Sequence, residues 1–90
     1  MSGMPRFLLE RTLGDITSEE LDAMAAKSSE LRDARYPQIT WEHTHVVQTD
    51  VGLKAFCIYA SPDAESIEAH SAELGMPIDR LHEVMTDLAP

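Results

Sequence analysis

The apolar and polar positions of this chain follow two different periods, which predict strands and helices in turn. Residues 5–13 and 39–48 are rich in strand-forming side chains, and a turn signal follows each of them. Residues 53–60 form a near-continuous apolar run, which predicts a central strand buried on both faces. A last strand is expected within residues 81–88, on a weaker pattern.

The first helix has the clearest start signal in the chain. Thr17 and Glu20 have the spacing of a capping box, in which each side chain bonds the free backbone N–H of the other residue. Apolar residues then recur at intervals of three and four, which predicts a helix over residues 18–33. It should stop before Pro37, since the residue preceding a proline avoids the helical region.

A second helix is predicted after the central strand. Ser61 is placed to cap it, with Pro62 at the first helical position, a favoured arrangement at a helix start. Gly75 is expected to end it, because glycine readily adopts the left-handed conformation found at helix ends.

The order strand, helix, strand, strand, helix, strand is the split βαβ motif. It predicts an α+β fold, the ferredoxin-like βαββαβ sandwich, with an antiparallel sheet and two helices on one face. The other face must then be solvated or covered by something else. Alternation along the second strand puts one set of side chains on a single face, which we expect to meet a partner subunit or a shared cavity: Ile39, Trp41, His43, His45 and Val47. Neither face of that strand is plainly polar, so we expect a homodimer closed sheet against sheet, a dimeric α/β barrel-like assembly.

Composition limits the class of protein and its partners. At 43% apolar and 26% charged residues, residues 1–90 are expected to form a single globular domain. Sixteen acidic against seven basic residues give a net charge of −9, which disfavours nucleic acid and anionic membranes and suits metal cations. The one cysteine excludes an intrachain disulfide. Neither a signal peptide nor an apolar membrane span is recognisable, so a cytoplasmic location is expected.

The pair His43 and His45 is the main candidate for chemistry. Two positions apart on a strand, both side chains would leave the same face, roughly 6.5–7 Å apart along the chain. Imidazoles at that spacing can converge on one Ni, Zn or Cu ion, although a tight site needs further donors. A second copy could supply them, and the chain itself offers further candidate ligands: Glu10, Cys57 (or Tyr59 on the same strand), His70 and His82. The alternative is that both histidines are surface or interface residues without a metal.

Each of the other candidates also has a purely structural interpretation. Cys57 lies within an apolar run, where a small packed side chain is the usual role of cysteine. His70 lies at the border of a helical apolar stripe and suits a hydrogen-bonded structural histidine. Glu10 and Arg11 are adjacent on a strand and must point to opposite faces. Trp41 could stack on a ligand beside the histidines or fill the dimer interface.

Short motifs spread over residues 4–84 keep a characteristic order and spacing: Pro5-Arg6-Phe7, Glu10-Arg11-Thr12, Trp41, Thr49-Asp50, Cys57-Ile58-Tyr59, Pro62, Gly75, Pro77 and Asp79-Arg80. In these motifs the chain resembles a family of small bacterial domains of unknown function whose members are described as nickel-binding proteins. The resemblance implies a ferredoxin-like subunit, a dimer and nickel sites, and no established reaction. Two departures bear on ligands: Thr44-His45-Val46 stands where the family pattern continues towards Ser-Tyr-Val, and Ala60 stands where an acidic residue is common.

Three functions are compatible with these observations. The first is a small non-catalytic homodimer that binds nickel or another divalent transition metal through His43 and His45. The second is an enzyme or small-ligand binder that uses the cavity of a dimeric barrel, lined by Glu10, His43, His45, Cys57 and Tyr59. The third is a regulatory or interaction module without a ligand.

Overall fold

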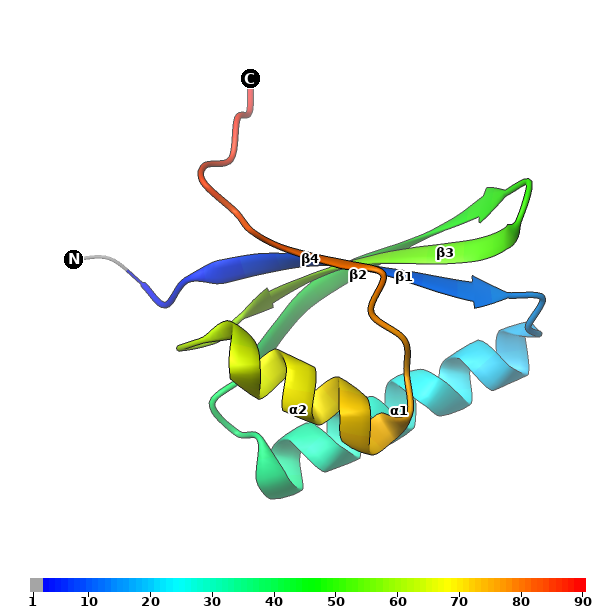
Figure 1. Ribbon diagram of the computed structural model, residues 1–90, viewed down its shortest axis with the longest axis horizontal. Helices are drawn as coiled ribbons and strands as arrows, with labels where there is room; N and C mark the ends of the chain where they lie inside the picture. The colour runs from blue at the N-terminus through cyan, green and yellow to red at the C-terminus, as the bar shows by residue number, and fades with distance from the viewer. Residues whose placement is uncertain (1–2) are drawn as a thin grey trace.

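The computed structural model describes residues 3–90, and in this range it contains four strands and two helices. They follow one another as β1 (Arg6–Gly14), α1 (Ser18–Arg35), β2 (Thr40–Thr49), β3 (Gly52–Ala60), α2 (Ala64–Leu74) and β4 (Arg80–Glu83). The strands form one antiparallel sheet in the order β2-β3-β1-β4. Both helices lie on the same face of this sheet (Figure 1). The predicted ferredoxin-like α+β fold is therefore confirmed.

None of the helices within residues 3–90 is long and apolar enough to cross a membrane.

Helix α1 begins where the sequence predicts and ends two residues later than predicted. The Glu20 backbone N–H donates to Thr17 Oγ1 at 3.1 Å, and the Thr17 backbone N–H donates to Glu20 Oε1 at 2.9 Å. The capping box is thus complete. The helix continues to Arg35 and ends before Pro37, as the restriction on the residue preceding proline requires.

The predicted start of α2 is wrong by two residues. Asp63, rather than Ser61, is the N-cap, and its carboxylate accepts a hydrogen bond from the Ser66 N–H at 2.8 Å. The buried Ser61 instead donates its hydroxyl to the carbonyl of Asp63 at 2.8 Å, which fixes the turn before the helix. Gly75 ends α2 in the left-handed conformation, as predicted, with φ of 70°. Strand β4 begins at residue 80, one residue earlier than expected.

The core lies between the sheet and the helices. Its buried apolar side chains are Phe7, Leu9, Ile39, Ala55, Cys57, Tyr59 and Ile67. Strand β3 is central in the sheet, as predicted, but within this chain only its helix-facing side is buried. Phe56 and Ile58 on the other side remain half-buried. We call this second side, away from the helices, the open face of the sheet.

Strand β2 departs from strict alternation because it contains a bulge. Trp41 pairs with Tyr59, but His43 pairs with Ile58, so that Glu42 is an extra residue on the β2 side. Beyond a bulge the side chains change faces. Trp41 therefore lies on the helix side, where its Nε1–H donates to Thr44 Oγ1 at 2.8 Å.

The expected common face of Ile39, Trp41, His43, His45 and Val47 is consequently wrong. Ile39 is buried in the core and Trp41 also faces the helices. The two histidines and Val47, which follow the bulge, point to the open face. A single inserted residue thus separates the only tryptophan from the histidine pair.

Candidate metal centre

The two histidines of β2 lie side by side on the open face. Both side chains are exposed, and their strand is an edge strand of the sheet. The centroids of the two imidazole rings are 5.0 Å apart, and the ring planes are inclined by 73°. After the bulge, side chains of β2 alternate regularly between the two faces of the sheet. Both rings therefore lie on the same face, as the His-X-His spacing predicts.

This separation can be compared with what a shared metal ion would require. With a metal–nitrogen distance of about 2.1 Å, a ring centroid lies roughly 3.2 Å from the metal. Two rings bound at about 90–110° to one another would then have centroids about 4.5–5.2 Å apart. The observed 5.0 Å lies within this interval. Two neutral imidazoles are also suitable donors for Ni, Cu or Zn.

Of the other predicted ligands, Glu10 and His82 share the open face with the histidine pair but lie away from it. Glu10 accepts a hydrogen bond from Lys54 Nζ at 2.8 Å, and its strand β1 is separated from β2 by β3. His82 lies on β4, at the opposite edge of the sheet. Three strand spacings of about 4.8 Å separate the edge strands, so His82 is roughly 14 Å from the pair.

The remaining two predicted ligands lie on the helix side of the sheet. Cys57 is buried in the core, consistent with its interpretation as a packed side chain. His70 is 1% exposed; its Nε2 lies 3.1 Å from the carbonyl oxygen of Ser28, and its ring packs edge-on against Tyr36. Burial lowers the pKa of His70, which favours the neutral form of its ring. The structure brings neither residue to the histidine pair.

Within residues 3–90, no three side chains of His, Cys, Asp or Glu are grouped closely enough to hold a metal ion. One copy of the described chain thus brings together two candidate donors.

The alternative of a barrel cavity lined by all five polar residues needs correction. Glu10, His43 and His45 lie on the open face, whereas Cys57 and Tyr59 lie on the helix side. The sheet itself separates the two sets, so they cannot line one pocket.

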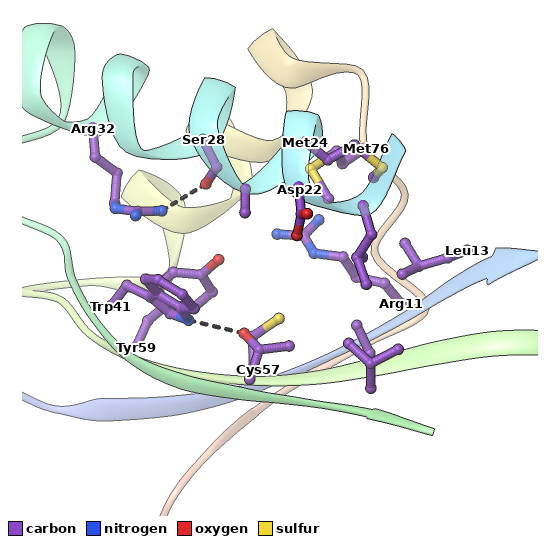
Figure 2. A pocket seen from close by; sticks show the side chains of 15 residues that line it. Arg11, Leu13, Asp22, Met24, Ser28, Arg32, Trp41, Cys57, Tyr59 and Met76 are labelled. Carbon is purple, nitrogen blue, oxygen red and sulfur yellow. Dashed lines mark hydrogen bonds between the residues drawn. The ribbon is translucent and has the colours of Figure 1, made fainter. Parts of the chain in front are cut away.

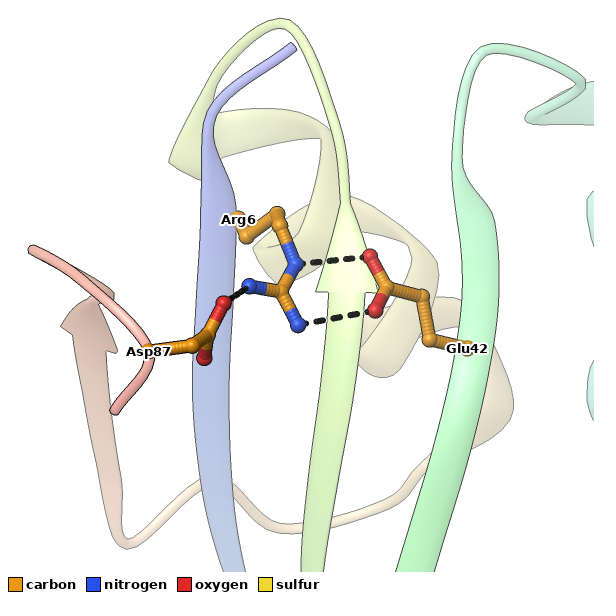
Figure 3. A network of polar contacts seen from close by, with 3 residues as sticks. All are labelled: Arg6, Glu42 and Asp87. Atoms are coloured by element: carbon orange, nitrogen blue, oxygen red, sulfur yellow. Dashed lines mark hydrogen bonds and ion pairs between the residues drawn. The ribbon is translucent and has the colours of Figure 1, made fainter. Parts of the chain in front are cut away.

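A charged network beside the pair is a feature that the sequence did not predict. Arg6 on β1 donates from Nε and Nη2 to the two carboxylate oxygens of Glu42, at 2.8 and 2.9 Å, and from Nη1 to Asp87 (Figure 3). The hydrogen bonds from Arg6 lower the pKa of Glu42, which therefore stays ionised next to His43. Glu42 is the extra residue of the bulge, and no sequence signal indicates the bulge.

These observations define a class of protein: a ferredoxin-like domain with an exposed pair of imidazoles on the open face of its sheet. Within that class, residues 7–84 match the family described as Nickel responsive protein SCO4226-like, and the chain belongs to this family.

A solved structure supports the fold. It is described as "Crystal structure analysis of SCO4226 from Streptomyces coelicolor A3(2)", and it superposes with a TM-score of 0.76 over 92% of this chain and 99% of that chain. The two sequences are 19% identical, a level at which the similarity shows the fold alone. Among curated proteins, no relative matches the chain.

Proposed function

We propose that this protein is a non-catalytic, metal-binding homodimer that holds nickel, or another divalent transition metal, through His43 and His45. The observation on which the proposal rests is the 5.0 Å separation of the two imidazole rings on one exposed face. This separation is compatible with two ligands of one ion. The net charge of −9 also favours a cation.

A second copy would supply what one chain lacks. The open face presents half-buried apolar side chains in its centre, Leu8, Phe56 and Ile58, and a partner sheet would cover them. Each copy also bears Glu10 and His82 on this face. In a two-fold pair, donors far from the histidines in one chain can approach the histidines of the other.

Nickel is proposed ahead of other metals because the family is described as nickel responsive. The donor set alone does not select it, since imidazole ligands suit Ni, Cu and Zn, and Cu binds such sites most tightly. Competition between metals is therefore part of the test.

The test is isothermal titration calorimetry of the untagged protein with NiCl₂, followed by competition with ZnCl₂ and CuCl₂. The double variant His43→Ala/His45→Ala should lose at least tenfold in nickel affinity. Thr40→Ala, which alters an exposed residue of the same strand without removing an imidazole, is the matched control and should bind as the wild type does. Unchanged stoichiometry and affinity in the double variant would refute the assignment.

A further inference from the structure

On the helix side of the sheet, a cavity of about 220 Å³ separates α1 from the strands. Figure 2 shows α1 above this space, with Arg11, Trp41, Cys57 and Tyr59 reaching into it from the strands. Leu21 and Met24 of α1 line this space and stay half-buried because the cavity lies beneath them. The cavity is thus a region where α1 and the sheet are not in direct contact.

Two arginines line this mostly apolar space. Arg11 is 1% exposed and Arg32 is 7% exposed. Within residues 3–90 neither forms an ion pair with a carboxylate, although the chain has an excess of acidic residues. A buried cation without a counter-ion is costly, and proteins usually pair it or neutralise it.

Arg11 has neutral hydrogen-bond partners, and they do not accept from every N–H of its guanidinium. Arg11 donates to the Pro77 carbonyl oxygen and to Ser71 Oγ, each at 3.0 Å. Its Nε–H is buried and has no acceptor in the part of the chain that the structure describes. A buried donor without a protein acceptor is a group that an anion entering the cavity would satisfy.

Arg32 is held differently, and its partners shape the other end of the cavity. It donates to Ser28 Oγ at 2.6 Å and to Ser29 Oγ at 2.9 Å. Its guanidinium lies 5.5 Å from the ring centroid of Trp41 and 5.9 Å from that of Tyr59, within cation–π range. This end therefore combines positive charge with two aromatic faces.

We propose that this helix-side cavity binds a small organic monocarboxylate with an apolar body, whose carboxylate pairs with Arg11 while its body lies against Trp41 and Tyr59. The size and the apolar walls favour such a molecule over a strongly hydrated inorganic anion. Asp22 also lines the cavity, and its charge disfavours a dianion. Access is from the β2 edge, where Trp41 and Val46 are 42% and 40% exposed. The sheet separates this site from the histidine pair, so the two proposals are independent.

The experiment uses the chain's one tryptophan, Trp41, as a reporter in the cavity. Its fluorescence is titrated with benzoate and hexanoate, with the neutral amides of the same two acids, and with sulfate, and calorimetry supplies the stoichiometry. We expect saturable binding of at least one acid at one molecule per chain, and binding of its amide at least tenfold weaker. The double variant His43→Ala/His45→Ala should bind the acid as the wild type does.

Two variants test the site itself. Arg11→Met should weaken acid binding at least tenfold, with Arg80→Met as the control that removes an exposed positive charge. Since Arg11→Met can unfold the core, Ala25→Phe is the second variant: it fills the cavity from α1 and leaves the arginines intact. It should abolish binding by calorimetry, whereas Ala26→Phe, at a neighbouring residue that does not line the cavity, should not. Failure of both acids to bind, equal binding of acid and amide, binding of sulfate alone, or unchanged binding in Ala25→Phe would each overturn the proposal.

Discussion

The buried ring of His70 links the stability of this fold to pH. Burial is the main cause that lowers its pKa, Arg32 and Arg11 act in the same direction, and the contact with Ser28 and the charge of Glu73 oppose them. In the unfolded chain the pKa of a histidine is about 6.5. Below that pH the unfolded state binds the proton more readily than the folded state, so stability should fall as the pH falls through about 6.5.

The expected slope has an upper limit of about 1.4 kcal/mol per pH unit, the value for one proton. Urea denaturation between about pH 7.5 and about pH 5.5, above the range of most carboxylates, would measure it. His70→Gln should flatten the slope, because glutamine cannot take up the proton. His82→Gln, at an exposed position of β4, is the matched control for loss of an imidazole. An equal slope in wild type and His70→Gln would contradict the prediction.

Gly52 is a position where the backbone admits glycine alone. Its φ is +97°, and a Cβ built on it would lie 2.8 Å from the backbone of Gly14. Gly52→Ala should therefore destabilise the fold by about 1–3 kcal/mol in chemical denaturation, through strain and a clash with backbone that cannot move aside. Gly3→Ala, where a Cβ meets nothing within 4 Å, should leave stability unchanged. Similar effects of the two substitutions would show that the turn relaxes freely.

Among the elements, α1 depends on its N-terminal capping box. Thr17→Ala removes the acceptor for the Glu20 N–H and should lower the free energy of unfolding by about 0.5–2 kcal/mol. Urea denaturation followed by circular dichroism would measure it. Ser18→Ala, at the exposed first residue of the helix, should have a much smaller effect. The prediction fails if both substitutions cost the same.

The elements also show which features the sequence can predict. The capping box of α1, the left-handed Gly75 and the order of strands and helices all follow from local patterns, and the structure confirms them. The sequence does not locate the start of α2, because Ser61 and Asp63 are both good caps and only the hydrogen bond from the Ser66 N–H to Asp63 distinguishes them.

The candidate site could be predicted only in part, because some of its features depend on contacts between residues that are distant in the sequence. The spacing of His43 and His45 fixes their common face locally, and the structure agrees. Whether the histidines share a face with Trp41 depends on the bulge at Glu42. The Glu42 carboxylate accepts two hydrogen bonds from Arg6 on β1. That contact joins residues 36 positions apart, so no local pattern could reveal it. The cavity beneath α1 also could not be predicted from local patterns, because it depends on how the helix packs on the sheet.

At the scale of the whole molecule, the net charge of −9 opposes association of two copies. If the proposed dimer forms through the apolar centre of the open face, screening this repulsion should tighten it. The Debye length falls from about 30 Å at about 0.01 M salt to about 8 Å at about 0.15 M. Analytical ultracentrifugation should therefore show a lower dissociation constant at the higher salt concentration.

Nickel should also shift the monomer–dimer equilibrium towards the dimer, by binding rather than by screening charge. An ion bound between two copies adds positive charge and shared ligands, so it should tighten the wild-type dimer most at low salt, where repulsion is strongest. In the variant His43→Ala/His45→Ala the salt effect should remain while the nickel effect disappears. A protein that stays monomeric with and without nickel at both salt concentrations would exclude the sheet-to-sheet dimer. A dimer that weakens with added salt would instead depend on attraction between opposite charges, and the apolar centre of the open face would not explain it.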